Sequence, residues 1–95
     1  MQKNHLKAYS KNLTFINCRI SGSQPFCYCK NLKLINCSME GCDLAFEKSS
    51  VNGNISTLKS VKNFYKGKIT SLSVVEEIKD DPKAKGKIIF SDLNL

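Results

Sequence analysis

The stretch Lys11-Asn12-Leu13-Thr14-Phe15-Ile16-Asn17-Cys18 returns further along the chain as Lys30-Asn31-Leu32-Lys33-Leu34-Ile35-Asn36-Cys37. Six of the eight positions are identical, and the offset between the two copies is 19. Self-similarity at a fixed period is typical of solenoids, in which each unit completes its core only by stacking on its neighbours. Each run is too short for a helix and is rich in strand-forming residues. The repeat therefore predicts an all-β solenoid.

A period of about 19 residues fits one turn of a parallel β-helix, because a helical repeat needs two helices and more than about 30 residues. We therefore predict an all-β, right-handed parallel β-helix of about four to five turns. Successive turns would lie about 4.8 Å apart, so that equivalent residues stack. We expect three inward columns, formed by Leu13, Leu32 and Val51, by Ile20, Met39 and Leu58, and by Phe26, Ala45 and Phe64. Three columns predict three inward-facing strands per turn.

A pentapeptide-repeat β-helix is the alternative fold, because Cys42-Asp43-Leu44-Ala45-Phe46 resembles one such unit. The five-residue rhythm does not persist along the chain, whereas the offset of 19 does. The repeat pattern therefore favours the first fold.

The same offset pairs Asn12 with Asn31 and Asn17 with Asn36. Stacked amide side chains form hydrogen-bonded ladders, and Asn tolerates the left-handed backbone of sharp bends. We interpret these residues as bend residues, and a polar ligand-binding row is the alternative.

The chain divides into three parts by composition. Residues 1–10 are polar and basic, and we expect a partly disordered or capping segment there. Residues 11–90 hold the turns, with short strands expected at 26–29 and 44–47, and residues 91–95 form a tail. These segments make one domain at most.

The third turn, expected from Ser50 to Gly67, is less regular. Asn52-Gly53-Asn54 has turn chemistry and should interrupt its strand, with Ile55 regaining an inward position after a one-residue slip. Residues 74–79 fit either a strand or a short amphipathic helix, and propensity favours the strand. Ile69 and Ile88 restore the offset of 19 further on.

The charge is strongly basic, with 15 Lys and Arg against 8 Asp and Glu and a net charge of +7. Only Arg19 is an arginine, whereas proteins that read nucleic acid rely on Arg for bidentate contacts. We therefore expect no specific nucleic-acid partner. Lysines on exposed strands also protect a solenoid from edge-to-edge pairing. A face that binds a polyanion is the alternative, because stacking aligns surface charges in stripes.

Cysteine usage points to a reducing compartment. Five cysteines are an odd number, and no stretch resembles the apolar region of a signal peptide or a membrane span. We expect a cytoplasmic location without membrane association, with Cys18 and Cys37 as stacked, buried thiols. Zinc binding by Cys27, Cys29, Cys42 and His5 can be imagined, but the spacing is not of the Cys-x-x-Cys type. We predict no metal and no cofactor.

Four stretches resemble the C-terminal part of an uncharacterised bacterial family, a domain-of-unknown-function family (3737) with a pectin-lyase-like right-handed parallel β-helix. They are residues 30–37, 43–47, 59–63 and 87–90. The resemblance covers residues 11–90. It implies that relatives carry many more turns, so that this chain corresponds to their last turns or to a shortened relative. It implies no activity and no catalytic residues.

Three functional hypotheses follow. The first is a non-catalytic structural or assembly segment that forms homo-oligomers through its open first turn, whose backbone groups lack a partner strand. The second is a module that binds a glycan or polyanion, with Tyr28 and Tyr65 as ligand-facing residues because they lie about two turns apart. The third is the remnant of a carbohydrate-active pectin-lyase-like enzyme. No pair of carboxylates in the sequence defines a glycosidase site, so we assign no catalytic residue and favour a non-enzyme.

Overall fold

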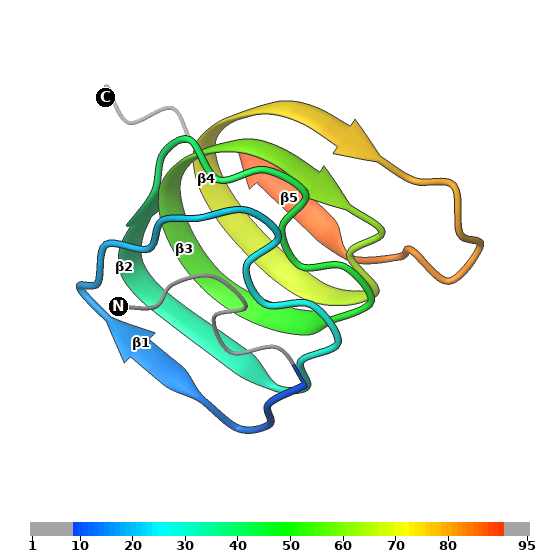
Figure 1. Ribbon diagram of the computed structural model, residues 1–95, viewed down its shortest axis with the longest axis horizontal. Coiled ribbons are helices and arrows are strands. Elements are labelled where there is room, and N and C mark those ends of the chain that lie inside the picture. The colour runs from blue at the N-terminus through cyan, green and yellow to red at the C-terminus, as the bar shows by residue number, and fades with distance from the viewer. Residues whose placement is uncertain (1–8, 91–95) are drawn as a thin grey trace.

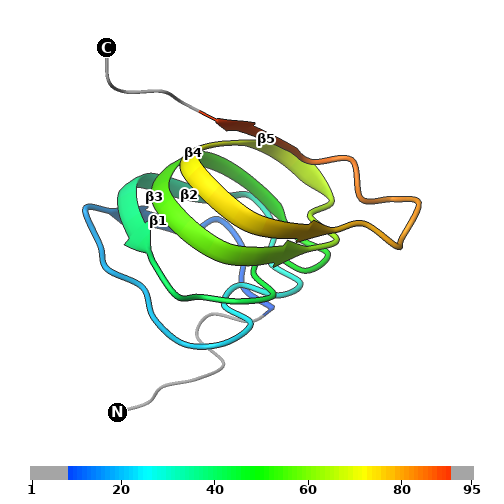
Figure 2. The same ribbon diagram turned by 90° about the horizontal axis from the view of Figure 1, so that it is seen from above.

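The computed structural model describes residues 9–90, which form a parallel β-solenoid of about four turns (Figure 1). Its five strands are β1 (Thr14–Ile16), β2 (Leu32–Met39), β3 (Ser50–Lys62), β4 (Lys66–Ile78) and β5 (Lys87–Phe90). They make one sheet in the order β1-β2-β3-β4-β5, and every pair is parallel. The chain runs clockwise as it recedes from its first turn, so the coil is right-handed (Figures 1 and 2). The predicted fold class is confirmed.

The predicted period sets the register in three of the four strand pairings, apart from one local shift. Phe15 opposes Leu34, Leu32 opposes Val51 and Met39 opposes Leu58, each at the predicted offset. Ile69 opposes Ile88, which confirms the return to that offset after the third turn.

The third turn is shorter than predicted. Every pair between β3 and β4 has an offset of 16, from Ser50 opposite Lys66 to Lys62 opposite Ile78. In the two earlier turns, the chain leaves the sheet at the end of β1 and of β2. Strand β3 continues beyond this level, so the third turn needs fewer residues to return to the start of the next strand. The expected third turn from Ser50 to Gly67 is therefore corrected to residues 50–65.

The expected interruption at residues 52–54 is wrong, because β3 runs unbroken through them. A register shift between Leu34 and Cys37 absorbs the irregularity, and Cys37 pairs with Ile55 after the predicted one-residue slip. Gly53 has a φ of 142°, and a Cβ atom at Gly53 would lie 1.8 Å from the carbonyl oxygen of Leu34. Glycine is used here for a close backbone approach within the sheet and does not make a turn.

Residues 74–78 belong to β4, so the strand interpretation of that segment is confirmed. The same is true of the last strand at residues 87–90. No helix that is long and apolar enough to cross a membrane occurs within residues 9–90.

The three strands per turn that the columns predicted are not present in the first two turns. Residues 24–28 and 44–48 close the coil opposite the sheet, and their alternate residues have a left-handed backbone. These residues are Gln24, Phe26, Tyr28, Leu44, Phe46 and Lys48, with φ between 53° and 65°. A backbone that alternates in this way cannot form a regular strand. The strands expected at residues 26–29 and 44–47 are therefore wrong.

A stack of phenylalanines fills the centre of the coil. The ring centroids of Phe26 and Phe46 lie 6.2 Å apart, and those of Phe46 and Phe64 lie 5.9 Å apart. All three side chains are fully buried, and each contributes about 2 to 3 kcal/mol of burial free energy. The predicted third column is therefore wrong at one position, since Phe46 replaces Ala45. The cause is one extra residue in the second turn, where Ser23 pairs with Asp43 at an offset of 20.

The asparagine ladders are confirmed. The Asn31 Nδ2 group donates to Asn12 Oδ1 at 2.8 Å, and Asn36 Nδ2 donates to Asn17 Oδ1 at 2.9 Å. All four residues have a φ between 54° and 59°. They mark the bends at both ends of the repeated stretch.

Gly53→Ala tests the close approach inside β3. We expect the free energy of unfolding to fall by at least about 3 kcal/mol, because the new methyl group would overlap a backbone carbonyl. Gly41→Ala is the matched control. Gly41 also has a positive φ, of 84°, but nothing lies within 4 Å of its Cβ position, so we expect a loss of about 1 kcal/mol. Equal losses in urea unfolding of the two variants would contradict the described packing.

Candidate anion-binding groove

Lysines stack at one corner of the coil, at the point where the chain enters the sheet. Backbone hydrogen bonds fix the alignment from turn to turn: Lys30 N donates to Ser10 O, Ser50 N to Cys29 O, Lys66 N to Ser49 O and Lys85 N to Tyr65 O. In a parallel ladder, these bonds place one residue of each turn in a single column. The column consists of Lys11, Lys30, Ser50, Lys66 and Lys85. Four of its five positions are therefore exposed lysines.

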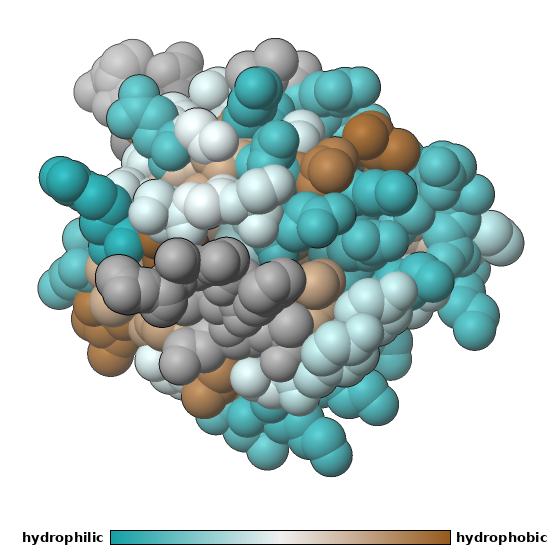
Figure 3. Space-filling model, viewed as in Figure 1, coloured by the Kyte–Doolittle hydropathy of each residue, from teal (hydrophilic) through white to brown (hydrophobic). Residues whose placement is uncertain are grey.

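A groove of about 850 Å³ follows this corner across the turns. Five lysines line it: Lys30, Lys48, Lys66, Lys83 and Lys85. The rest of its lining consists of Asn31, Ser49, Ser50, Tyr65 and Pro82, so none of these ten residues is acidic. Hydrophilic side chains predominate on this side of the coil, below a smaller hydrophobic patch (right in Figure 3).

One wall of the groove is the loop of residues 79–86, and a buried side chain holds its start. Asn63 is 3% exposed. Its Nδ2 group donates to Asp80 Oδ1 at 2.8 Å, and its Oδ1 atom accepts hydrogen bonds from the backbone N–H groups of Asp80 and Asp81. The Asn63 side chain thereby fixes the start of the loop that carries Lys83 and Lys85.

The end of the loop lies directly on the phenylalanine stack. Gly86 N donates to Phe64 O at 2.9 Å, and a Cβ atom at Gly86 would lie 2.5 Å from the Phe64 ring. Because Phe64 is part of the core, the position of this wall depends on core packing.

Tyr65 connects the groove to the middle of the loop. Its hydroxyl group donates to Asp81 Oδ2 at 2.8 Å, and Asp81 Oδ1 accepts a hydrogen bond from Lys83 N at 2.9 Å. The second bond makes Asp81 the first residue of a tight turn, which is the role that Asp commonly takes before Pro. Asp81 is therefore a loop anchor whose two oxygens are both used.

The charges around this anchor shift two pKa values. The Lys83 N–H bond, the Tyr65 hydrogen bond and the nearby Lys48 and Lys83 ammonium groups lower the pKa of Asp81 below its ordinary value of 3.8. A lowered pKa stabilises the loop above pH 3.8, and this contribution is lost as the pH falls through the folded-state pKa. The hydrogen bond to Asp81 is the main cause that raises the pKa of Tyr65 above 10.0.

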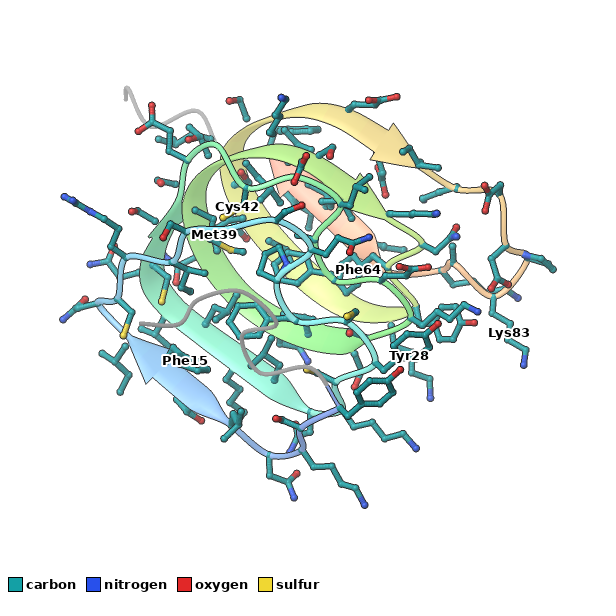
Figure 4. The ribbon with its side chains drawn as sticks, in the orientation of Figure 1. Phe15, Tyr28, Met39, Cys42, Phe64 and Lys83 are labelled. Atoms are coloured by element: carbon teal, nitrogen blue, oxygen red, sulfur yellow. The ribbon has the colours of Figure 1, made fainter. Side chains whose placement is uncertain are left out.

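Tyr28 and Tyr65, the two tyrosines expected to face a ligand, lie on the same side of the coil. Tyr65 lines the groove, whereas Tyr28 stacks on Tyr9 with ring centroids 5.0 Å apart and planes within 3°. Lys48 Nζ lies 5.6 Å from the centroid of the Tyr28 ring. Figure 4 shows Tyr28 and Lys83 on this side, with Phe64 inside the coil.

Other chemistry-bearing residues lie elsewhere. Asp43 accepts a hydrogen bond from Ser23 Oγ at 2.8 Å. Within residues 9–90, no three His, Cys, Asp or Glu side chains gather closely enough to hold a metal ion, and the proposed ligand His5 lies outside the described residues.

No disulfide joins the five cysteines, and four of them contribute to the core. Cys29, Cys37 and Cys42 are buried, and Cys18 packs against the same core from a half-buried position. Burial, followed by the charge of Asp43, raises the pKa of the Cys42 thiol to about 11. A thiol with this pKa is unreactive at neutral pH.

Sequence reasoning did not assemble this groove. Lys11 and Lys30 belong to the quoted repeat, and Lys66 and Lys85 share its offset. The sequence did not predict that the two pairs belong to one column, because their alignment depends on the shorter third turn. A search for lysines at the offset of the repeat would have found both halves of the column.

Comparison with known proteins assigns a family and no activity. The family Protein of unknown function (DUF3737) matches residues 1–90. No curated protein and no solved structure matches the chain significantly.

The Tyr65–Asp81 hydrogen bond is testable by ultraviolet titration of the three tyrosines. We expect the transition of one tyrosine to lie above that of an ordinary tyrosine, and Asp81→Ala to bring it down, because the carboxylate favours the neutral phenol. Asp43→Ala is the control, since Asp43 bonds to Ser23 instead. Identical titration curves for the wild type and Asp81→Ala would show that the contact does not form in solution.

Proposed function

Because the chain belongs to the family Protein of unknown function (DUF3737), we propose its function from its own surface: it binds a polyanion in the lysine-lined groove. The observation that supports this proposal is the convergence of five lysines on one groove with no acidic residue in its lining. Positive charges that lie close together repel one another. A bound anion would remove this repulsion, which the free protein retains.

The structure of the groove suits a charged polymer better than a small ligand. The groove crosses several turns, and its lysines come from four separate segments of the chain. Each lysine presents a compact ammonium group with three donors and little geometric demand. Affinity would then come from the summed charge, as in other electrostatic recognition of polymers.

The other polar residues of the groove extend this proposal. Asn31, Ser49 and Ser50 supply neutral hydrogen-bonding groups beside the lysines, and Tyr65 supplies one aromatic ring. We propose that Tyr65 contacts the ligand directly. Tyr28 would act beside it, by supporting Lys48 through their ring contact.

Charge removal in the groove tests the function. Binding of heparin, poly(U) RNA and long-chain polyphosphate to the 95-residue protein would be measured by fluorescence anisotropy at low salt, about 50 mM. We expect at least one probe to bind, and Lys66→Ala with Lys85→Ala to weaken its binding by roughly tenfold or more. Lys59→Ala with Lys62→Ala removes the same charge from the opposite end of β3 and should have a much smaller effect. If none of the three probes binds, the function is wrong.

Self-association is a second candidate function, supported by the two outer strands of the sheet. Within residues 9–90, β1 pairs only with β2 and β5 pairs only with β4. Ile16 on β1 is 57% exposed and Phe90 on β5 is 59% exposed. We propose that a second copy pairs at the first turn, as a sheet edge with free backbone groups allows.

Sedimentation equilibrium tests this second candidate. We expect the apparent mass to rise with protein concentration, and Ile16→Lys to reduce the rise, because it places a charge at the proposed contact. Lys33→Ala, on the neighbouring strand, is the control for a general change in surface charge. A clean monomer across the whole concentration range would rule out association through this edge.

A further inference from the structure

We propose that the ligand of the groove is inorganic polyphosphate, extended along the axis of the coil, and that its track continues beyond the groove to Lys11. This inference depends on the polyanion-binding function proposed above. It adds the chemical class of the ligand, its direction and one further contact residue.

The direction follows from the backbone register. The column of Lys11, Lys30, Ser50, Lys66 and Lys85 is parallel to the coil axis, because each member opposes the next across the ladder. Its neighbours are about 4.8 Å apart. The groove includes the last four of these positions. Lys11 continues the same column by one turn, since it pairs directly with Lys30.

A second basic row runs beside the first. Thr14, Lys33, Asn52, Lys68 and Lys87 oppose one another in successive strands, and all five are exposed. Three of the five are lysines. Together the two rows place a lysine on every turn except at β3, where Ser50 and Asn52 are neutral.

Charge does not continue along a strand in the same way. In β4, Lys66 and Lys68 are followed on the outer face by Thr70 and Leu72, which are uncharged. A polymer that followed the strand would leave the basic rows after two lysines. A polymer that crosses the turns meets lysine at four of the five positions of the column, so the axial direction gains more charge contacts.

The density of charge in the groove identifies the class of polymer. Five ammonium groups share a groove of about 850 Å³, so the occupant must carry many negative charges in a short length. Polyphosphate has a negative charge on every phosphate, with only a bridging oxygen between neighbours. Its oxygens accept the N–H donors that lysine presents, and phosphate binding by lysine does not need a planar fork.

Single-stranded nucleic acid fits the described surface less well. Proteins that bind single strands without sequence preference stack successive bases on several aromatic rings. Tyr65 supplies one ring to the groove, and Tyr28 is already stacked on Tyr9. The groove lining contains no arginine, which such proteins use for stacking on bases.

The experiment compares Lys11→Ala with Lys59→Ala in the 95-residue protein. Both variants lose one exposed lysine, but Lys59 lies outside both basic rows. The probes are tripolyphosphate and a polyphosphate of about 60 units. Three steps of the ladder, about 14 Å, separate Lys11 from Lys66, and tripolyphosphate is shorter than this distance.

We expect Lys11→Ala to weaken binding of the long chain several-fold and to lower the salt dependence by about one charge. Binding of tripolyphosphate should weaken less than that of the long chain in this variant, and Lys59→Ala should bind both probes like the wild type. Equal effects of Lys11→Ala and Lys59→Ala on the long chain would overturn the axial track. If Lys11→Ala and Lys59→Ala had equal effects, loss of binding in the Lys66 and Lys85 double variant would still support polyanion binding in the groove.

The class of ligand has its own competition test. Poly(U) of matched charge should displace fluorescent polyphosphate only at a higher concentration than unlabelled polyphosphate. Displacement by poly(U) at a lower concentration would show that the ligand class is wrong, while leaving polyanion binding intact. Failure of every polyanion to bind would remove both the inference and the function on which it rests.

Discussion

The parallel backbone ladder between successive turns is the constraint on which this structure depends. Each turn of the coil must present its N–H and C=O groups to the next turn at the same points, because backbone groups buried without partners cost free energy. The ladder therefore decides which side chains are neighbours, even where the residues between them vary. Phe15 above Leu34 and Leu32 above Val51 are direct products of this constraint.

The coil tolerates large local irregularities because the ladder resumes after each one. Gly53 allows the close approach that absorbs a one-residue shift, and the offset of the repeat then returns at Met39 and Leu58. The left-handed residues of the closing segments cost about 1 kcal/mol each for a bulky side chain such as Phe46. Burial of that side chain in the aromatic stack offsets this cost, since a fully buried Phe contributes about 2 to 3 kcal/mol.

The sequence predicted the features that repeat and missed those that depend on a changed turn length. The fold class and the asparagine ladders followed from residues that recur at one offset. The third column was wrong because one extra residue in the second turn replaces Ala45 with Phe46. The groove was missed for a related reason: Lys48 and Lys83 reach it from closing segments whose path cannot be read from apolar periodicity. The repeat offset therefore predicts contacts only in the turns whose length equals that offset.

The same ladder explains why a cluster of like charge persists at one corner of a small protein. The backbones of Lys30, Lys66 and Lys85 cannot move apart without breaking hydrogen bonds that hold consecutive turns together. Two anchors add to this restraint: Asn63 fixes the start of the loop that carries Lys83 and Lys85, and Gly86 fixes its end against Phe64. The core thus holds positive charges close together, and the resulting repulsion is part of the free energy of the unliganded protein. Lysines that served only solubility would not need to cluster at one corner. Lysines spread over all faces would protect the sheet edges with less repulsion between their charges. The position of the charges is therefore the observation on which the proposed recognition of an anion rests.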